Sequence, residues 1–348
     1  MAKTFVALEI SEESVRAVEL TAGRSPSLVA LGEVPLPREA ARDSEVLDQD
    51  AVAVALRQLW MGAAIKARHV TLGVGSRRIL VREYTTQAMA PAMLKQALPY
   101  QVQDLLPVPV SQAVLDFYPQ AQHGDQVTGL LVAAVSENIE QMITTLAKAK
   151  LRVENVDLVP FGLARLSKRV AEPGETVAMI HLGDHTTHVT VATDGVPHFV
   201  RIIPVDIATA ATVRRDAAMP PADAQVMEML EPVGASGIMP RRNDGTRASM
   251  RSGGASGSQA VSDLVARLRS TISFFQSREG APPIKRVMVS GAGYTAPGVA
   301  DALERSFDLA VVPVRLENIV NTRNRTLNDD LSLNAVATAG VLFGEGAK

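Results

Sequence analysis

The sequence predicts an α/β protein of two related lobes that face each other across a cleft, with a small α+β unit inserted into the first lobe. Three observations support this fold class: a globular composition, a strand pattern that recurs once at a fixed spacing, and a different pattern between the two copies. The chain has 348 residues, which is enough for two or three core-sized units.

The composition is that of a globular protein and excludes several function classes. Hydrophobic residues make up 47% of the chain and charged residues 21%. The net charge of -2 provides no basic footprint, so we expect no nucleic acid partner. The chain has no cysteine, which excludes disulfides, thiolate catalysis and cysteine-based zinc sites.

The N-terminal segment does not resemble a secretion signal. Glu9 interrupts its first apolar run, and Glu12 and Glu13 follow. The sequence has no uninterrupted apolar run near the roughly 20 residues that cross a bilayer. We therefore expect a cytoplasmic protein whose membrane association is indirect, through a partner.

A strand-turn-strand pattern occurs twice, at a constant offset of 172 residues. Residues 5–20 alternate apolar and polar positions on either side of a short polar turn, and residues 177–192 do the same. Each copy is followed by a Gly-containing turn and a third strand, at 27–36 and 196–205. The pattern predicts two lobes that each open with a three-stranded meander. Chance similarity of two hairpins is the alternative.

The segment between the two copies has its own character. Residues 70–85 predict two strands around a turn, and a helix begins at Pro91 and ends before Pro107. Two more strands are expected at 113–120 and 128–136, and an amphipathic helix at 137–150. These elements predict an inserted α+β unit.

The second half continues with helices and one buried strand. Residues 221–230 predict a helix that opens at Pro221, and the Gly-, Ser- and Arg-rich residues 234–258 predict a disordered loop. An amphipathic helix is expected at 261–275, a buried strand that runs into a glycine turn at 284–293, and a helix at 297–306. The predicted divisions are 1–80 with 151–175 (first lobe), 81–150 (inserted unit), 176–210 with 285–348 (second lobe) and 211–284 (its accessory part).

Six segments of the chain resemble a known family. They are ALEISEESVRAVEL, ALPYQVQDLLPVPVSQAVLDF, LLVAAVSENIEQMITTLAKAKLRVENVDLVPFGLARL, IHLGDHTTHVTVATDGVPHFVRII, VSGAGYTAPGVADAL and LNAVATAGVLFG. Together they resemble the PilM family of type IV pilus assembly proteins, whose actin-like (ribonuclease-H-like) two-lobed fold, with an inserted subdomain, is shared with FtsA. The resemblance runs nearly end to end, and residues 97–166 are its most specific part.

The resemblance implies a nucleotide cleft, but this sequence departs from the family's pattern there. The nine matching positions are Glu9, Ser11, Ser14, Arg16, Gly183, Thr186, Thr187, Gly291 and Gly293. The family's Asp, Gly and Lys of the first phosphate loop fall on Glu9, Ser11 and Arg16, and the Asp of the second falls on His181. Serine in place of glycine blocks close backbone approach, and histidine in place of aspartate removes an oxygen ligand for Mg²⁺. We therefore expect ATP and Mg²⁺ to bind weakly or not at all, no catalytic residue and no enzyme activity.

Three other residue groups permit a chemical reading and a structural one. His181, His185 and His188 lie close in sequence, but without cysteines or typical ligand spacing we predict no metal site. Ser290 precedes Gly291 without the spacing of a nucleophile elbow, so a glycine turn explains it better. Asp116, Asp157 and Arg201 are matched in the family and are expected to have structural roles.

The resemblance also implies a protein partner. The family binds the cytoplasmic N-terminal peptide of PilN, a single-span inner-membrane protein, in a groove between the inserted subdomain and the first lobe. The candidate contacts here are Leu105, Leu106, Val108, Val110 and Leu115, with Arg78, Arg82 and Arg165 at the rim. Core packing is the alternative role for the apolar members of this set.

The expected function is therefore a cytoplasmic scaffold of a type IV pilus or a type II secretion-like apparatus, held at the inner face of the membrane by its partner. Two alternatives remain: an active ATP-binding and hydrolysing protein of the same fold, and an FtsA-like membrane-associated filament protein. The second normally requires a basic amphipathic C-terminal helix, and this chain ends in GEGAK. Self-association is left open.

Overall fold

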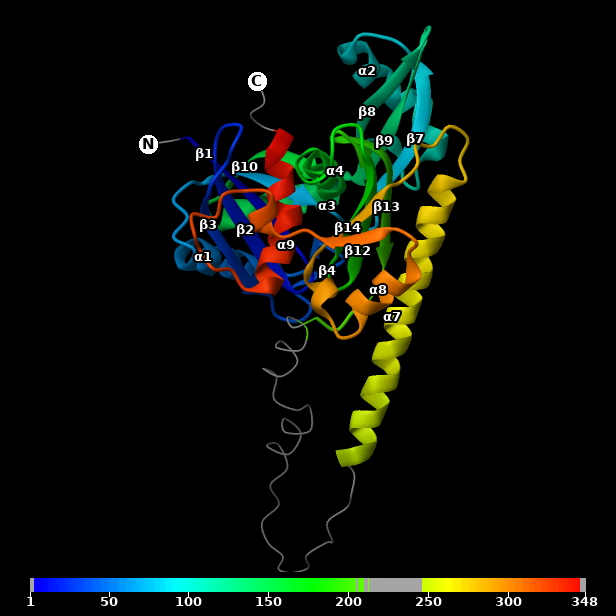
Figure 1. Ribbon diagram of the computed structural model, residues 1–348. Helices are drawn as coiled ribbons and strands as arrows, with labels where there is room; N and C mark the ends of the chain where they lie inside the picture. The colour runs from blue at the N-terminus through cyan, green and yellow to red at the C-terminus, as the bar shows by residue number, and fades with distance from the viewer. Residues whose placement is uncertain (1–2, 205, 210–211, 213–245, 345–348) are drawn as a thin grey trace, which may run out of the picture.

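Two five-stranded mixed sheets form the framework of the computed structural model, which describes residues 3–204, 206–209, 212 and 246–344 (Figure 1). The first sheet has the order β3-β2-β1-β6-β10. Its strands are β1 (Thr4–Ile10), β2 (Ser14–Thr21), β3 (Leu28–Pro35), β6 (His69–Val74) and β10 (Arg152–Leu158). The first three form an antiparallel meander, and β6 and β10 add to β1 in parallel.

The second sheet repeats this topology with the order β13-β12-β11-β14-β15. Its strands are β11 (Thr176–Leu182), β12 (Thr186–Thr193), β13 (Val196–Pro204), β14 (Arg286–Ser290) and β15 (Ala310–Pro313). The strands β11 and β12 begin and end 172 residues after β1 and β2. The predicted internal repeat is therefore confirmed, as a meander followed by two parallel strands in each lobe.

The core of the first lobe lies between its sheet and two helices, α1 (Gln49–Gly62) and α3 (Ser136–Lys148). The helix α1 begins after Asp48, whose carboxylate accepts hydrogen bonds from the backbone N–H groups of Asp50 and Ala51. The short strands β4 (Ala41–Arg42) and β5 (Glu45–Val46) lie before α1. The helix expected at 137–150 is present as α3, but it packs on α1 and β10 in this core rather than only within the inserted unit.

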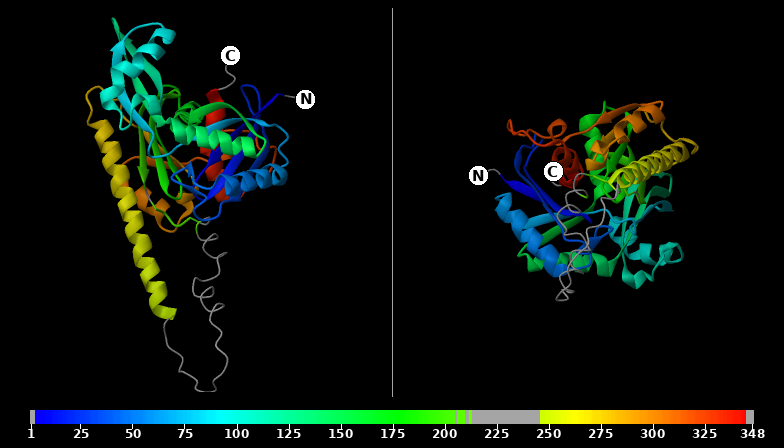
Figure 2. Two further views of the ribbon diagram at one scale, coloured as in Figure 1. Left: turned by 180° about the vertical axis from the view of Figure 1, so that it is seen from behind. Right: turned by 90° about the horizontal axis from the view of Figure 1, so that it is seen from below.

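Two helices lie between the sheets and form the layer that joins the lobes (Figures 1 and 2). They are α4 (Val159–Val170), which packs on β12, and α9 (Asp329–Gly340), which packs on β2. The helices touch at Gly162 and Gly340: a Cβ on Gly162 would lie 2.8 Å from the carbonyl carbon of Gly340. A backbone contact this close requires glycine. The turn η5 (Val341–Gly344) follows α9.

The outer face of the second sheet is covered by α7 (Thr246–Gln276) and α8 (Val299–Ser306). Figure 1 shows α7 as one long helix that extends beyond the sheets. The helix predicted at 261–275 lies within α7. The predicted loop at 234–258 is corrected over 246–258, where the chain is helical. Despite its Gly and Ser residues, this stretch continues toward the N-terminus the helix that packs on the second sheet farther along the chain. Residues 234–245 and the helix predicted at 221–230 lie outside the described residues.

The inserted unit is a three-stranded sheet with one helix across it, at the top of Figure 1. The sheet order is β7-β9-β8, with β7 (Leu80–Gln87), β8 (Ala113–His123) and β9 (Gln126–Val135), and the helix is α2 (Pro91–Val102). Two short turns, η1 (Gln103–Leu105) and η2 (Val110–Gln112), lead from α2 to β8. An ion pair between Glu83 and Arg278 joins β7 to the residues after α7.

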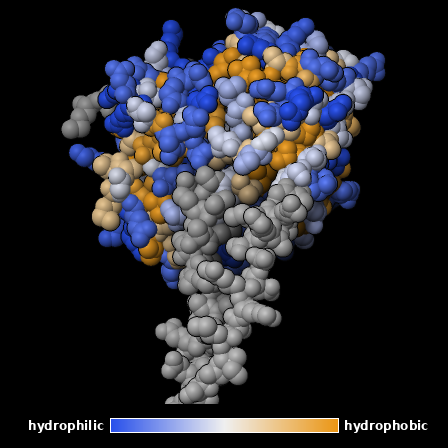
Figure 3. All heavy atoms as spheres, turned by 60° about the horizontal axis from the view of Figure 1, so that its bottom comes forward, coloured by the Kyte–Doolittle hydropathy of each residue, from blue (hydrophilic) through white to orange (hydrophobic). Residues whose placement is uncertain are grey.

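The lower end of the molecule has a mixed surface. Figure 3 shows hydrophilic residues there with hydrophobic patches between them. Within the described part of the chain, none of the helices has the length and apolar character needed to cross a membrane.

Candidate functional site

The turns of two equivalent hairpins meet where the lobes face each other. Residues 11–13 join β1 to β2, and residues 183–185 join β11 to β12. The pairing registers place Glu9 opposite Arg16 in the first hairpin and His181 opposite His188 in the second. The repeat thus brings four polar side chains to corresponding positions around one cleft.

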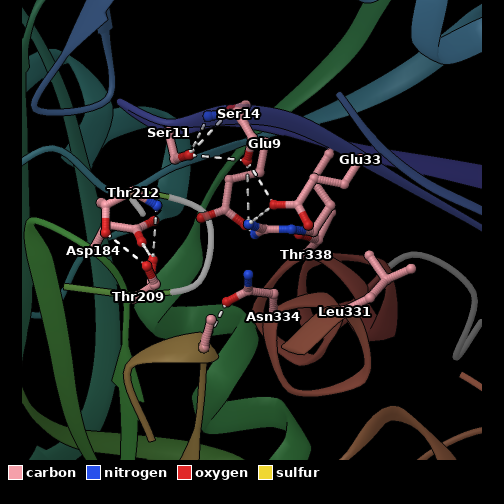
Figure 4. Close-up of polar contacts among 12 residues, drawn as sticks. Glu9, Ser11, Ser14, Glu33, Asp184, Thr209, Thr212, Leu331, Asn334 and Thr338 are labelled. Atoms are coloured by element: carbon pink, nitrogen blue, oxygen red, sulfur yellow. Dashed lines mark hydrogen bonds and ion pairs between the residues drawn. The ribbon is translucent and has the colours of Figure 1, made fainter. Parts of the chain in front are cut away.

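An arginine lies inside this cleft between two carboxylates of its own lobe. The guanidinium of Arg16 is 4% exposed, donates to Glu33 Oε1 at 2.8 Å and lies 3.5 Å from Glu9 Oε2. Burial opposes its charge, but Glu33 and Glu9 outweigh burial, and the pKa of Arg16 is raised above its ordinary value. Thr338 of α9 donates to Glu9 at 2.7 Å. Figure 4 shows Glu9, Ser14 and Glu33 of the first lobe close together, with Thr338 of α9 nearby.

The hairpin turns use their backbone N–H groups internally. The N–H of Ser11 donates to the carbonyl of Ser14 at 2.9 Å, and the N–H of Ser14 donates to the hydroxyl of Ser11 at 3.0 Å. In the second turn the N–H of Gly183 donates to the carbonyl of Thr186 at 3.0 Å. A phosphate site of this type requires such groups to point at the ligand, so these three are already engaged.

Two buried histidines form the second-lobe wall, with their rings stacked at 6.1 Å. His181 Nδ1 is 3.0 Å from Ser290 Oγ, and His188 Nε2 donates to the carbonyl of Gly75 at 2.9 Å. Burial lowers the pKa of both imidazoles, for His181 well below its usual value, because each is fully enclosed. Both rings are therefore neutral at pH 7, and His188 links the second lobe to the first.

A third histidine joins the two turns as a cation. His185 Nε2 lies 2.6 Å from Glu13 Oε1 and 3.7 Å from Glu12 Oε1, and His185 Nδ1 lies 2.7 Å from Asp206 Oδ1. The hydrogen bond to Glu13 is the main cause that raises the pKa of His185 to about 9. At pH 7 the imidazolium therefore donates both N–H groups to carboxylates, one on each lobe.

The three histidines have separate partners: His181 bonds to Ser290, His188 to Gly75, and His185 to Glu13 and Asp206. Ligand atoms of Glu12, Glu13 and His185 lie within 4.8 Å of one another. The short contact between His185 and Glu13 is that of an imidazolium–carboxylate pair.

The space left in the cleft is small. The centre of a water-sized sphere can occupy about 30 Å³ between the hairpins. By the same measure, one water molecule needs about 10–15 Å³. Arg16, Glu9 and the histidines fill the rest. Asp184 faces this space with a pKa raised by burial, although Thr209 donates a hydrogen bond to it (Figure 4).

The glycine turn that follows β14 packs against β11. Gly291 has φ +91°, and a Cβ there would lie 2.2 Å from the carbonyl oxygen of Leu182. Its N–H donates to the carbonyl of Leu333, and the N–H of Ala292 donates to Asn334 Oδ1 at 2.7 Å. The glycine turn predicted after Ser290 therefore packs between β11 and α9, and Gly291, named above as a candidate nucleotide residue, makes these contacts.

The structure brings together most of the predicted cleft residues. Glu9, Ser11, Arg16, Gly183 and Thr186 line the space, whereas Ser14, Thr187, Gly291 and Gly293 lie behind it. The residues that sequence reasoning did not assign are Glu33, Asp184, Asp206, Thr209, Asn334 and Thr338, and His185 was considered only as a metal ligand. Glu33 could have been found from the sequence, because the pairing of adjacent strands places Glu33 of β3 opposite Arg16 of β2.

The predicted partner residues do not form one surface. Leu105, Leu106 and Leu115 pack against the small apolar core of the inserted unit. Arg165 of α4 pairs with Asp157 of β10, and Arg82 is exposed on β7. Val108 and Val110 are half-buried between η1 and β8. Only Arg78 of this set lines the narrow groove between the first lobe and the inserted unit.

That groove combines a carboxylate with apolar walls. Glu45 Oε1 accepts hydrogen bonds from Asn138 at 2.7 Å and from Ser76 at 3.2 Å, and Glu45 Oε2 pairs with Arg78 at 2.9 Å. Burial raises the pKa of Glu45 despite these partners. The remaining wall is apolar and comprises Val74, Ile79, Ala134, Val135, Ile139 and Met142.

Comparisons with known proteins give the same fold and one family. The sequence model of the family described as "Type IV pilus assembly protein PilM" matches residues 7–202. A solved "PilM-PilN type IV pilus biogenesis complex" contains a chain 21% identical to this one, with a TM-score of 0.77 over 99% of this chain and 98% of that one. The ethanolamine utilization protein EutJ from Carboxydothermus hydrogenoformans is 11% identical, with a TM-score of 0.50 over 98% of this chain and 89% of EutJ. The fold is actin-like, as predicted.

Proposed function

This chain belongs to the PilM family of type IV pilus assembly proteins, and we propose that it acts in assembly as a cytoplasmic scaffold rather than as a nucleotide-driven enzyme. The proposal has two parts. A groove on the first lobe accepts the cytoplasmic N-terminal tail of a PilN-like inner-membrane protein, and internal ion pairs occupy the place of a nucleotide. The tail would hold the chain at the inner face of the membrane.

The observation that carries the second part is the position of Arg16 between Glu9 and Glu33. A magnesium nucleotide requires free backbone N–H groups, carboxylates that face the metal and space for phosphates. Here the N–H groups of Ser11, Ser14 and Gly183 are engaged within the turns. Glu9 pairs with Arg16 and Thr338, and about 30 Å³ of the cleft is free. Binding would require separation of the two turns that His185 joins.

The first part is supported by the solved relative, which is a complex of PilM with PilN. In this chain the groove lined by Arg78, Glu45 and Met142 lies where the first lobe meets the inserted unit. An extended tail would place apolar side chains against the wall around Met142. Its backbone groups would form hydrogen bonds with side chains that now bond to Glu45. Because the free volume is about 10 Å³, the tail must shift rim side chains such as Arg78.

Binding of a fluorescently labelled N-terminal peptide of the PilN-like protein tests this assignment. Arg78→Glu and Asn138→Ala change residues that line the groove, whereas Val114→Asp changes an exposed apolar position on β8 that does not line it. We expect the two groove variants to weaken fluorescence-polarization binding about tenfold or more and Val114→Asp to leave it unchanged. Loss of binding only in Val114→Asp would move the site to β8 and refute the groove.

A further inference from the structure

A second pocket lies at the end of the molecule opposite the hairpin turns. It is formed by the start of β1, the turn between β2 and β3, the C-terminal end of α4 and η5, so both ends of the chain contribute to it (Figure 1). Its free volume is about 360 Å³, within the range of about 300–1,000 Å³ typical of small-molecule sites. It shares no lining residue with the cleft.

The floor of this pocket is apolar and partly aromatic. Phe5 and Phe343 line it, with Leu20 and Leu342 between them. Leu20 is 2% exposed and Leu342 is 8% exposed, so both belong to the core between the sheets and hold the floor in place. Such a floor favours an apolar ligand body, at about 25 cal/mol for each Å² of apolar surface buried.

The rim of the pocket is cationic. Arg24, Lys168 and Arg169 line it, and Lys3 lies over the Phe5 ring at 4.9 Å. The guanidinium of Arg169 lies over the Phe343 ring at 4.4 Å and donates to the carbonyl of Arg24 at 2.7 Å. These two contacts fix the orientation of Arg169 at the edge of the floor. Partial burial lowers the pKa of Arg169 from its ordinary value.

Among the described residues, these cations have no acidic partner. In the part of the chain that the structure describes, no carboxylate lies within ion-pair distance of Arg24, Lys168 or Arg169, and none lines the pocket. Other arginines of the chain do pair with a carboxylate; they include Arg16, Arg42, Arg77, Arg78, Arg165, Arg278, Arg286 and Arg315. An anion in the pocket would therefore not have to displace a carboxylate of the described residues from Arg24, Lys168 or Arg169.

We propose that this pocket binds a small organic phosphate, with the phosphate held by Arg24, Lys168 and Arg169 and the apolar body lying on the floor between Phe5 and Phe343. A guanidinium offers a planar pair of donors that matches phosphate geometry, and a lysine adds a mobile point charge. Several cations around one position favour a dianionic phosphate monoester over a single carboxylate. The concave shape and volume favour one soluble molecule rather than a flat membrane surface.

The test is calorimetric titration of the full chain with 1-naphthyl phosphate. We expect one molecule of 1-naphthyl phosphate to bind per chain. Inorganic phosphate and 1-naphthol should bind at least about tenfold more weakly, because the first lacks the apolar body and the second lacks the phosphate. Arg169→Gln and Lys168→Gln should each weaken 1-naphthyl phosphate about tenfold, the lower end of the loss expected for a charge-assisted hydrogen bond. Arg305→Gln makes the same charge change on an exposed position of α8 and should have no effect.

The outcomes separate the ligand sources. Sedimentation with vesicles that contain phosphatidic acid, lost in Lys168→Gln and absent with phosphatidylcholine alone, would identify a lipid headgroup as the source of the same phosphate chemistry. Absence of 1-naphthyl phosphate binding overturns the proposal. So does binding that Arg169→Gln and Lys168→Gln leave unchanged, because the ligand would then lie elsewhere. Lys168 is exposed, so its variant reports on binding even where Arg169→Gln disturbs folding.

Discussion

The imidazolium of His185 links the stability of the closed cleft to pH. Its folded pKa is about 9, against an ordinary value of 6.5. A group whose pKa is raised on folding contributes stability that is fully present below the unfolded pKa and is lost as pH rises through the folded pKa. The contribution of His185 is therefore complete below about pH 6.5 and absent above about pH 9.

The magnitude follows from the shift and from the exposure of the partners. A shift of this size corresponds to roughly 3 kcal/mol at 1.36 kcal/mol per pKa unit. The side chain of His185 is 26% exposed and that of Asp206 is 88% exposed, so solvent screening reduces the effect. We expect about 1–2 kcal/mol in the free energy of unfolding, chiefly from the pair with buried Glu13.

The assay is urea unfolding of the wild type and His185→Gln between pH 6 and pH 10. At pH 6 the wild type should be the more stable by about 1–2 kcal/mol, and the difference should shrink toward zero by pH 10. The exposed His123→Gln serves as the matched control and should show no pH-dependent difference. A wild-type advantage over His185→Gln that stays constant across this range would refute the reasoning, as would a pKa near 6.5 for His185 measured by NMR titration.

Three further substitutions test the packing and the cleft by urea unfolding at pH 7. Gly162→Ala should destabilise the protein by about 1–3 kcal/mol, because the new Cβ would lie 2.8 Å from α9 backbone, whereas Gly62→Ala, with nothing within 4 Å, should be neutral or stabilising; equal effects would contradict the helix contact. Arg16→Met should cost about 3–5 kcal/mol because it leaves buried carboxylates without their cation, and adding Glu9→Gln should recover part of the loss; no recovery would argue against the network. Asp48→Ala should cost about 1 kcal/mol by removing the cap of α1, and a change below about 0.3 kcal/mol would show that the cap is not used.

The fold was largely predictable because its main signals are periodic. Two strands with alternating polarity recur at 172 residues, and the structure reproduces that spacing in both hairpins. The helix over residues 246–258 was not predicted, because its Gly and Ser content is typical of loops and it continues a helix that the second sheet stabilises. The packing of α3 on α1 was also missed, since an amphipathic pattern shows that a face is buried but not against which element.

The cleft was predictable in place but not in detail. The resemblance located the two turns, and the substitutions at Glu9, Ser11 and His181 indicated an altered site. The ion network could not be predicted, because Thr338 reaches Glu9 across 329 residues and no local pattern connects them. The same holds for the pairing of His185 with Glu13, which depends on how the two lobes close.

The central claim is that this PilM-family chain binds a partner tail and not a nucleotide, and titration calorimetry tests it most directly. The purified chain would be titrated first with ATP and Mg²⁺ and then with the N-terminal peptide of the PilN-like protein. The account predicts heat of binding with the peptide and none with the nucleotide. Tight ATP binding would contradict it, because Arg16, Glu9 and His185 would then have to separate and form a working site.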